Sequence, residues 1–162
     1  MLDLKNWFSP KHYKRLWNVG PPGLIMSLLL IYLTLQYEAA LNIKKYETGH
    51  MWIDVLFFLI LLEMLFILIW ALFCLPPKNR GKKLSTRGIY SFIRHPIYTV
   101  IIFHINLLAS LWVGSYLLLF LVPLQYLLWS KIVIKEEEYL VGIFGQEYID
   151  YMSNVSRFIP WK

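Results

Sequence analysis

Cysteine, charge and the familiar catalytic motifs are all scarce in this chain. A single cysteine, Cys74, stands among 162 residues, which excludes an intrachain disulfide framework and a multi-cysteine metal or iron–sulfur centre. Charged residues make up 16% of the chain and apolar residues 58%, whereas a soluble domain has about 25% and about 45–50%. The composition indicates a membrane protein and excludes a disordered chain or a soluble nucleic-acid-binding domain.

Several motifs that mark common enzyme classes are also missing. The chain contains no GxGxxG after a strand, no GxxxxGK[ST], no HExxH and no GxSxG, so nothing predicts a dinucleotide fold, a P-loop, a zinc protease or a serine hydrolase. No metal site is predicted. The first 20 residues have no apolar core followed by a small-residue cleavage site, so we expect no cleavable signal peptide.

Apolar stretches dominate what is present. Residues 21–41 and 51–75 are each long enough to cross a hydrocarbon core of about 30 Å as a helix. Residues 95–130 contain no Lys, Arg, Asp or Glu and would form a straight helix of roughly 54 Å, so the chain must turn back. Val113-Gly114-Ser115 is the best turn signal. We therefore predict an all-α integral membrane fold with four spans, 21–41, 51–75, 97–112 and 115–134, the last two forming a tight hairpin with Pro123 in its second leg.

The basic residues predict the orientation of this fold. Of 16 Lys and Arg, only Lys44 and Lys45 lie in the loop between the first two spans. The positive-inside rule then places both termini and the loop 76–96 in the cytoplasm, and we expect a prokaryotic inner membrane. Residues 1–20 would be an interfacial segment, and residues 135–162 a helical cytoplasmic tail that closes a cofactor site. The charge of +6 thus needs no nucleic-acid partner.

Two polar clusters lie at the cytoplasmic ends of the predicted hairpin. One is TRGIYSFIRHPIY, residues 86–98; the other is EEE, residues 136–138, followed by FGQEYIDYMSNVSRFIP, residues 144–160. The hairpin brings them together, so that Arg94 and His95 would face glutamates, with aromatic rings at the edge. Such walls suit a zwitterionic ligand with a planar base. If the fourth span ends at residue 134, the glutamates oppose the helix dipole, which favours a functional role.

These blocks resemble a known family. The order TxGxYxxxRHPxY, hairpin, acidic pair and FGxEYxxYxxxVxRxIP over residues 85–161 is similar to the isoprenylcysteine carboxyl methyltransferases and the related membrane phospholipid methyltransferases. The resemblance implies S-adenosylmethionine as cofactor, bound at the cytoplasmic face, and a lipophilic acceptor that enters from the bilayer. The residues that it implies at the cofactor site are Tyr90, Arg94, His95, Tyr98, Glu136, Glu137, Tyr148, Tyr151 and Arg157. Glu137 and Arg94 would be catalytic, with Glu137 as the base.

Two positions depart from the family pattern. Many relatives have a Gly shortly after the Tyr of RHPxY, where this chain has Thr99-Val100, and many have an Arg where this chain has Ile132. Lys131 or Lys135 would be the substitute charge, although Lys lacks the bidentate fork of Arg.

Glu63 is a carboxylate in the middle of a span. An ionised carboxylate at this depth is costly, so we expect it to face the bundle interior, with His104, Asn106 or Gln125 as its partner. It would form a structural hydrogen bond or, with His104 and Asn106, line an acceptor tunnel.

The sequence predicts an S-adenosylmethionine-dependent membrane methyltransferase. The acceptor would be an isoprenylcysteine-like carboxylate, a phospholipid amine or a thiol. Two alternatives stay open. One is a non-catalytic membrane scaffold with the same fold, and the other is an NADPH-dependent membrane reductase.

Overall fold

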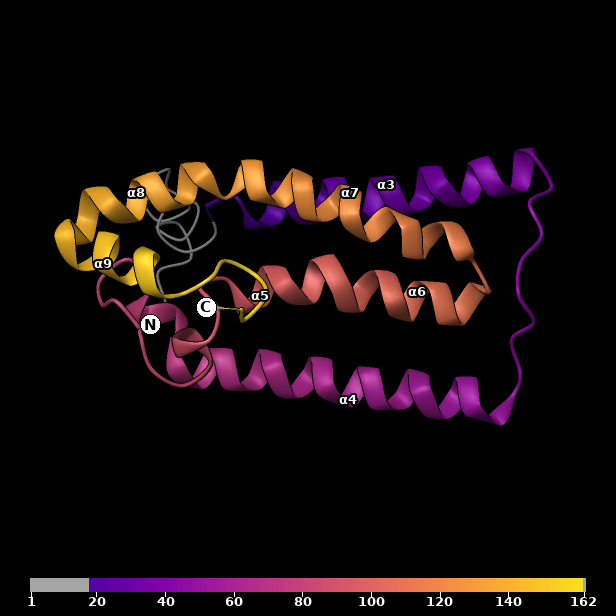
Figure 1. Ribbon diagram of the computed structural model, residues 1–162, viewed down its shortest axis with the longest axis horizontal. Helices are drawn as coiled ribbons and strands as arrows, with labels where there is room; N and C mark the ends of the chain where they lie inside the picture. Colours follow the sequence, from indigo (N-terminus) through magenta and orange to yellow (C-terminus); the bar gives the residue numbers. More distant parts are fainter. Residues whose placement is uncertain (1–17, 162) are drawn as a thin grey trace, which may run out of the picture.

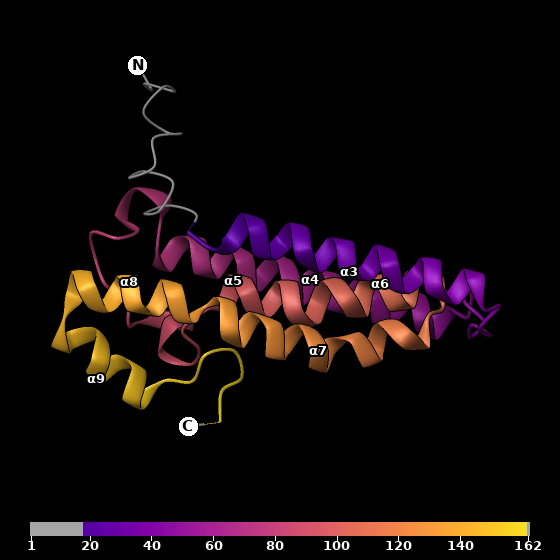
Figure 2. The same ribbon diagram turned by 90° about the horizontal axis from the view of Figure 1, so that it is seen from above.

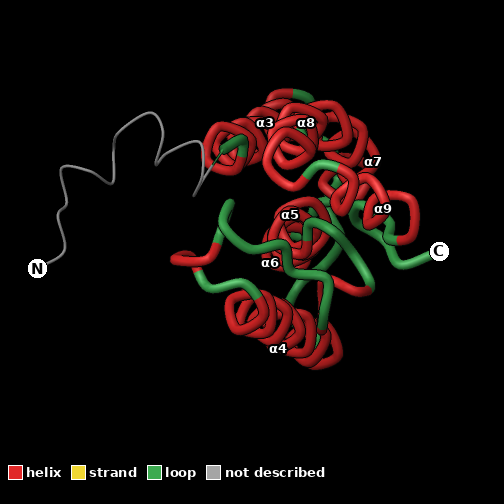
Figure 3. Tube along the Cα trace, turned by 90° about the vertical axis from the view of Figure 1, so that its left-hand side faces the viewer, coloured by secondary structure: helices red, strands yellow, loops and turns green. Residues whose placement is uncertain are grey.

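The computed structural model describes residues 18–161, and this part of the chain is built from helices (Figures 1 and 3). The helices are α3 (Gly20–Ala40), α4 (Met51–Cys74), α5 (Pro96–Thr99), α6 (Ile105–Val113), α7 (Tyr116–Ile132), α8 (Ile134–Phe144) and α9 (Gln146–Asn154). Short 3-10 turns η1 (Pro77–Asn79) and η2 (Gly88–Ser91) lie in the loop after α4. The all-α fold class is confirmed.

Four helical runs are long and apolar enough to cross a membrane: Gly20–Ala40, Met51–Cys74, Pro96–Val113 and Tyr116–Phe144. Their starts agree with the predicted spans to within one residue. Many of their large apolar side chains are exposed, as expected where lipid rather than protein covers the surface. The chain is therefore an integral membrane protein. The first 17 residues of the predicted interfacial segment lie outside the described residues.

The turn between the third and fourth spans lies where the sequence predicts it. Gly114 ends α6 in the left-handed region with φ of 72°, and Ser115 caps α7 by accepting a hydrogen bond from the Leu118 backbone N–H. The Ser115 hydroxyl also donates to the buried carboxylate of Glu38 at the end of α3. The backbone N–H of Tyr46, in the α3–α4 loop, donates to the Gly114 carbonyl at 2.9 Å. The end of the bundle far from the RHP segment is thus held by polar contacts among three segments.

The two legs of this hairpin differ from the prediction. The third span contains a π-helical turn, η3 (Val100–His104), between α5 and α6. The fourth span does not end at residue 134, because only Val133 separates α7 from α8 and the helical run continues to Phe144. Glu136 and Glu137 consequently lie in the first turn of α8 rather than at a helix C-terminus. The helical run passes through both glutamates, so the dipole argument, which placed them at a helix C-terminus, was wrong.

Helices α5 and α6 lie in the middle of the bundle, with α4 on one side and α3 and α7 on the other (Figures 1 and 3). Helix α4 is largely exposed and buries only Ile53 and Ala71. At the end away from Gly114, α8, α9 and the C-terminal segment fold back beside α5 and η2 (Figure 2). This end holds the residues of both sequence clusters.

We predict that Gly114→Ala destabilises the hairpin. A Cβ at this position would lie 2.4 Å from the Tyr46 carbonyl oxygen, and the positive φ adds strain, so we expect a loss of about 1–3 kcal/mol and a lower Tm in detergent. Gly142→Ala in α8 is the control, because its Cβ would meet nothing within 4 Å and Ala favours the helix. Equal Tm values for the two variants would contradict this account.

Candidate active site at one end of the bundle

The RHP segment is fastened to the C-terminal segment by backbone hydrogen bonds. The N–H of Arg94 donates to the Ser156 carbonyl at 2.9 Å, and the N–H of His95 donates to the Arg157 carbonyl at 3.0 Å. Pro96 follows at the first position of α5, where its missing N–H leaves no unsatisfied bond. The side chains of Arg94, His95 and Arg157 therefore come from two hydrogen-bonded stretches of backbone beside α8.

Glu137 accepts charge-assisted bonds from both arginines. Arg94 Nη2 lies 2.7 Å from Glu137 Oε1, and Arg157 Nη2 lies 2.7 Å from Oε2. Each arginine adds a second bond through its Nε, from Arg94 to the same Oε1 and from Arg157 to the same Oε2, so each guanidinium donates twice to the carboxylate. His95 Nε2 lies 3.3 Å from Oε1. The Glu137 residue is 5% exposed, and its charge is balanced within this network.

Arg94 is also bonded to the backbone of the tail. Its Nη1 donates to the carbonyls of Met152 and Val155, at the end of α9. This guanidinium thus joins the start of the third span, α8 and the tail. It acts first as a structural centre of this end of the protein.

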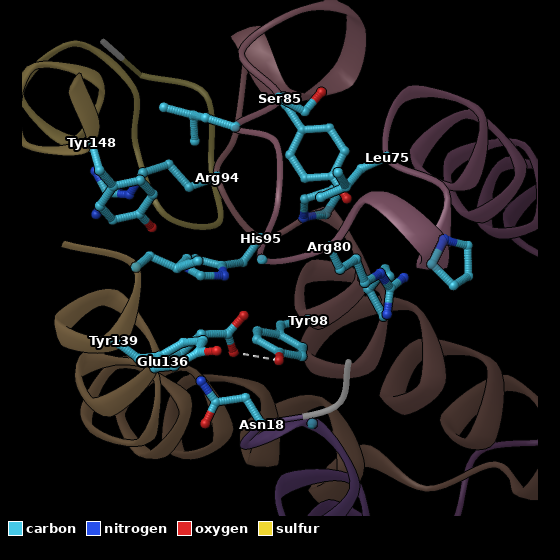
Figure 4. A pocket seen from close by; sticks show the side chains of 18 of the residues that line it. Asn18, Leu75, Arg80, Ser85, Arg94, His95, Tyr98, Glu136, Tyr139 and Tyr148 are labelled. Carbon is cyan, nitrogen blue, oxygen red and sulfur yellow. Dashed lines mark hydrogen bonds between the residues drawn. The ribbon is translucent and has the colours of Figure 1, made fainter. Parts of the chain in front are cut away.

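A cavity of about 630 Å³ opens beside this network (Figure 4). Seven of the predicted site residues line it: Tyr90, Arg94, His95, Tyr98, Glu136, Tyr148 and Tyr151. Its volume lies within the range of roughly 300–1,000 Å³ that is usual for small-molecule sites. The structure therefore brings the RHP segment, α8 and α9 to one cavity, as the sequence pattern predicts.

The cavity has a polar part and an apolar part. In the polar part the Tyr98 hydroxyl donates to Glu136 Oε2 at 2.5 Å, and the His95 ring stacks on Tyr98 with centroids 5.4 Å apart. Apolar side chains come from the ends of three spans: Leu24 of α3, Leu72 of α4, and Ile97 and Ile101 of the third span, with Leu75 just after α4. One cavity thus presents a carboxylate and aromatic rings at one side and a hydrocarbon surface at another.

The buried tyrosines of this site are neutral donors. Burial raises the pKa of Tyr90 to about 12 despite the nearby Arg80 charge, and it raises the pKa values of Tyr148 and Tyr151 still further. The Tyr151 hydroxyl donates to the Tyr90 carbonyl, which ties α9 to η2. Because none of the three ionises near neutral pH, they shape the cavity rather than take up protons.

The geometry contradicts the prediction that Glu137 is a catalytic base facing the cofactor. It is absent from the cavity lining, and both of its oxygens are bonded to cations. A carboxylate held in this way resists protonation. Arg157 also lies outside the lining and contacts Glu137 instead. The adjacent Glu136, one position along the same helix, is the carboxylate that faces the cavity.

The residues predicted to line an acceptor tunnel lie apart from this cavity. Glu63, His104 and Asn106 lie outside this cavity lining. The Glu63 side chain is 63% exposed, 3.8 Å from His104, so the expectation that it faces the bundle interior was wrong. Asn106 instead pairs with Gln125. Lys131 and Lys135 are exposed and outside the lining, so neither supplies a charge there.

Other cavity residues escaped the sequence reasoning. The loop after α4 contributes Arg80, Lys83 and Ser85, and α8 contributes Tyr139. The basic residues of that loop were interpreted as topological signals only. Gly20 and Pro21 place the start of α3 at the cavity, and no sequence motif marks them.

Comparison with known proteins agrees with this arrangement. The profile of the isoprenylcysteine carboxyl methyltransferase (ICMT) family matches residues 68–142, from the end of α4 through the hairpin into α8. We call these matched residues the ICMT-family segment. The resemblance deduced from the sequence is confirmed. The ICMT-family segment includes Arg94, His95, Tyr98 and both glutamates, whereas α3 and α9 lie outside it.

Two curated relatives are methyltransferases by name. Methanethiol S-methyltransferase 1 of Bradyrhizobium diazoefficiens is 30% identical over 84 residues, which are 49% of this chain and 27% of that protein. Protein-S-isoprenylcysteine O-methyltransferase of Schizosaccharomyces pombe is 36% identical over 86 residues, 51% of this chain and 35% of that protein. The matched regions thus span roughly a third or less of the relatives' length. No solved structure matches the chain.

We predict that Glu137→Gln lowers stability by about 3–5 kcal/mol, because it removes the charge that balances Arg94 and Arg157 in a buried site. Thermal unfolding in detergent measures the loss. Glu138→Gln, an exposed neighbour in the same helix, is the matched control and should change stability by less than about 0.5 kcal/mol. A Glu137→Gln protein as stable as this control would show that the network is dispensable.

Proposed function

We propose that this protein transfers a methyl group from S-adenosylmethionine to a small lipophilic or amphiphilic acceptor at the cytoplasmic face of the membrane. The observation that carries the proposal is the cavity with Glu136, His95 and Tyr98 at one side and the apolar ends of three spans at another. A donor with charged and planar parts and an acceptor with a hydrocarbon part fit these two surfaces. The ICMT-family match of the segment around the cavity supports the same reaction.

The polar side has the chemistry that the donor requires. Glu136 would accept hydrogen bonds from the amino group or the ribose. Arg80 brings a second guanidinium to the cavity, and we assign the carboxylate of the donor to it. Tyr139 and Tyr148 offer rings for the adenine (Figure 4). The bound donor supplies an activated methyl group, so no side-chain nucleophile is needed.

The work left to the protein is orientation and exclusion of water. Arg94, Glu137 and Arg157 fix the tail against α8, which places Tyr148 and Tyr151 of α9 over the cavity. The ends of α3, α4 and the third span supply its apolar surface. Holding donor and acceptor in line accounts for much of the acceleration that such a site can provide.

The acceptor belongs to one of three classes: a prenylcysteine-like carboxylate, a phospholipid amine or a thiol. The names of the two relatives cover an isoprenylcysteine and methanethiol. If the acceptor must lose a proton, Glu136 is the carboxylate that reaches the cavity, so we reassign the base role from Glu137 to Glu136. The Tyr98 hydroxyl would hold this carboxylate in place through their hydrogen bond.

We predict that the purified protein binds S-adenosylhomocysteine and that Glu136→Gln weakens this binding at least about tenfold, because a hydrogen bond to a charged group is lost. Isothermal titration calorimetry in detergent measures both affinities. Glu138→Gln, an exposed neighbour, should bind as the wild type does. Binding of NADPH without S-adenosylhomocysteine would support the reductase alternative, and binding of neither would support the scaffold.

The cytoplasmic assignment of the site follows from charge. Lys78, Arg80, Lys82, Lys83 and Arg87 lie in the loop at the site end, while Lys44 and Lys45 lie in the loop at the far end. The positive-inside rule directs the site to the cytoplasm. We expect Lys45→Cys, but not Lys135→Cys, to react with a membrane-impermeant maleimide in intact cells, each in a Cys74→Ala background. The reverse labelling would place the site outside.

A further inference from the structure

Helix α3 contacts the proposed donor site from outside the ICMT-family segment. Gly23, in the second turn of α3, faces the ring of Trp129 in α7, and a Cβ on Gly23 would lie 2.4 Å from Trp129 Cη2 and 2.7 Å from Cζ2. Only a glycine leaves room for the indole at this place. The first span therefore packs closely against the Trp129 side chain of the fourth span.

Burial and a hydrogen bond hold Trp129 against α3. It is fully buried, and its indole Nε1 donates to Ser27 Oγ at 2.9 Å, one turn further along α3. Gly23 thus fits one part of the ring by shape, and Ser27 fixes its polar atom. Trp129 does not line the cavity, so it does not touch a ligand there.

Trp129 also packs against Tyr98. The two rings stack with centroids 4.6 Å apart and planes 30° apart. Tyr98 stacks in turn against His95 with planes only 11° apart, and its hydroxyl holds Glu136. A ring stacked against two others has little rotational freedom, so Trp129 restricts where the Tyr98 hydroxyl can meet Glu136. Figure 4 shows Tyr98 with its hydroxyl bonded to Glu136.

We propose that Trp129, which packs against Gly23 and bonds to Ser27, is a positioning residue that orients Glu136 for the amino or ribose group of the methyl donor. This role rests on the proposed function. The indole fixes the Tyr98 ring before the donor arrives, so less side-chain freedom is lost when the donor binds. The contact also gives α3, which lies outside the ICMT-family segment, a defined part in donor recognition.

Trp129→Phe tests the role because it keeps an apolar ring but removes the bond to Ser27 and part of the stacking surface. Calorimetry should show S-adenosylhomocysteine binding weakened by about 3- to 10-fold. The matched control is Trp112→Phe, the same substitution at an exposed tryptophan near the hairpin turn, which should leave the affinity unchanged. Ser27→Ala removes only the hydrogen bond and carries the test, with a loss of about 2- to 5-fold, if Trp129→Phe fails to fold.

A double-variant cycle separates positioning from general stability. If Trp129 acts through Glu136, Trp129→Phe added to Glu136→Gln should weaken binding no further than Glu136→Gln alone. Losses that multiply would overturn the positioning role, as would wild-type affinity in both Trp129→Phe and Ser27→Ala. A wild-type protein that fails to bind S-adenosylhomocysteine would instead overturn the proposed function, so the two failures are distinguishable.

Discussion

The ion pairs of Glu137 with Arg94 and Arg157 are the interaction on which the site end of this protein depends. It joins the start of the third span, the first turn of α8 and the C-terminal segment, which are far apart along the chain. A buried carboxylate between two guanidinium groups offsets the desolvation of each only when its geometry is good. The paired bonds from each guanidinium meet that condition, and they place α9 beside the cavity.

Two neighbouring glutamates have separate tasks because they lie in a helix. Successive residues of an α-helix point about 100° apart, so Glu137 reaches the arginines while Glu136 reaches Tyr98 and the cavity. The acidic pair therefore serves structure with one member and, in our proposal, ligand binding with the other.

Much of the fold could be predicted because it follows from local signals. Long apolar stretches defined the spans, and Gly114 marked a turn that only a residue tolerant of positive φ makes easily. The end of the fourth span could not be located by charge, since the helix continues through Glu136, which is bonded to Tyr98, and Glu137, which is paired with Arg94 and Arg157. The π-helical turn at Val100–His104 likewise has no sequence signal that we recognised.

The sequence predicted which residues lie at the site better than it predicted the role of each. The RHP segment and the tail were expected to meet at the hairpin mouth, and they do. Which glutamate faces the cavity depends on helix phase and on the competition for Arg94, and neither is visible in a motif. Arg80 and the contact of Gly23 with Trp129 were missed because each depends on a long-range approach of the chain.

The central claim is that one cavity holds the methyl donor between Glu136 and Arg80. A structure of the protein determined with saturating S-adenosylhomocysteine tests it most directly. The account predicts density in this cavity, with the amino acid part of the ligand beside Glu136 and Arg80 and its ring among the tyrosines. Ligand bound elsewhere, or an empty cavity in a protein shown to bind the ligand, would contradict it.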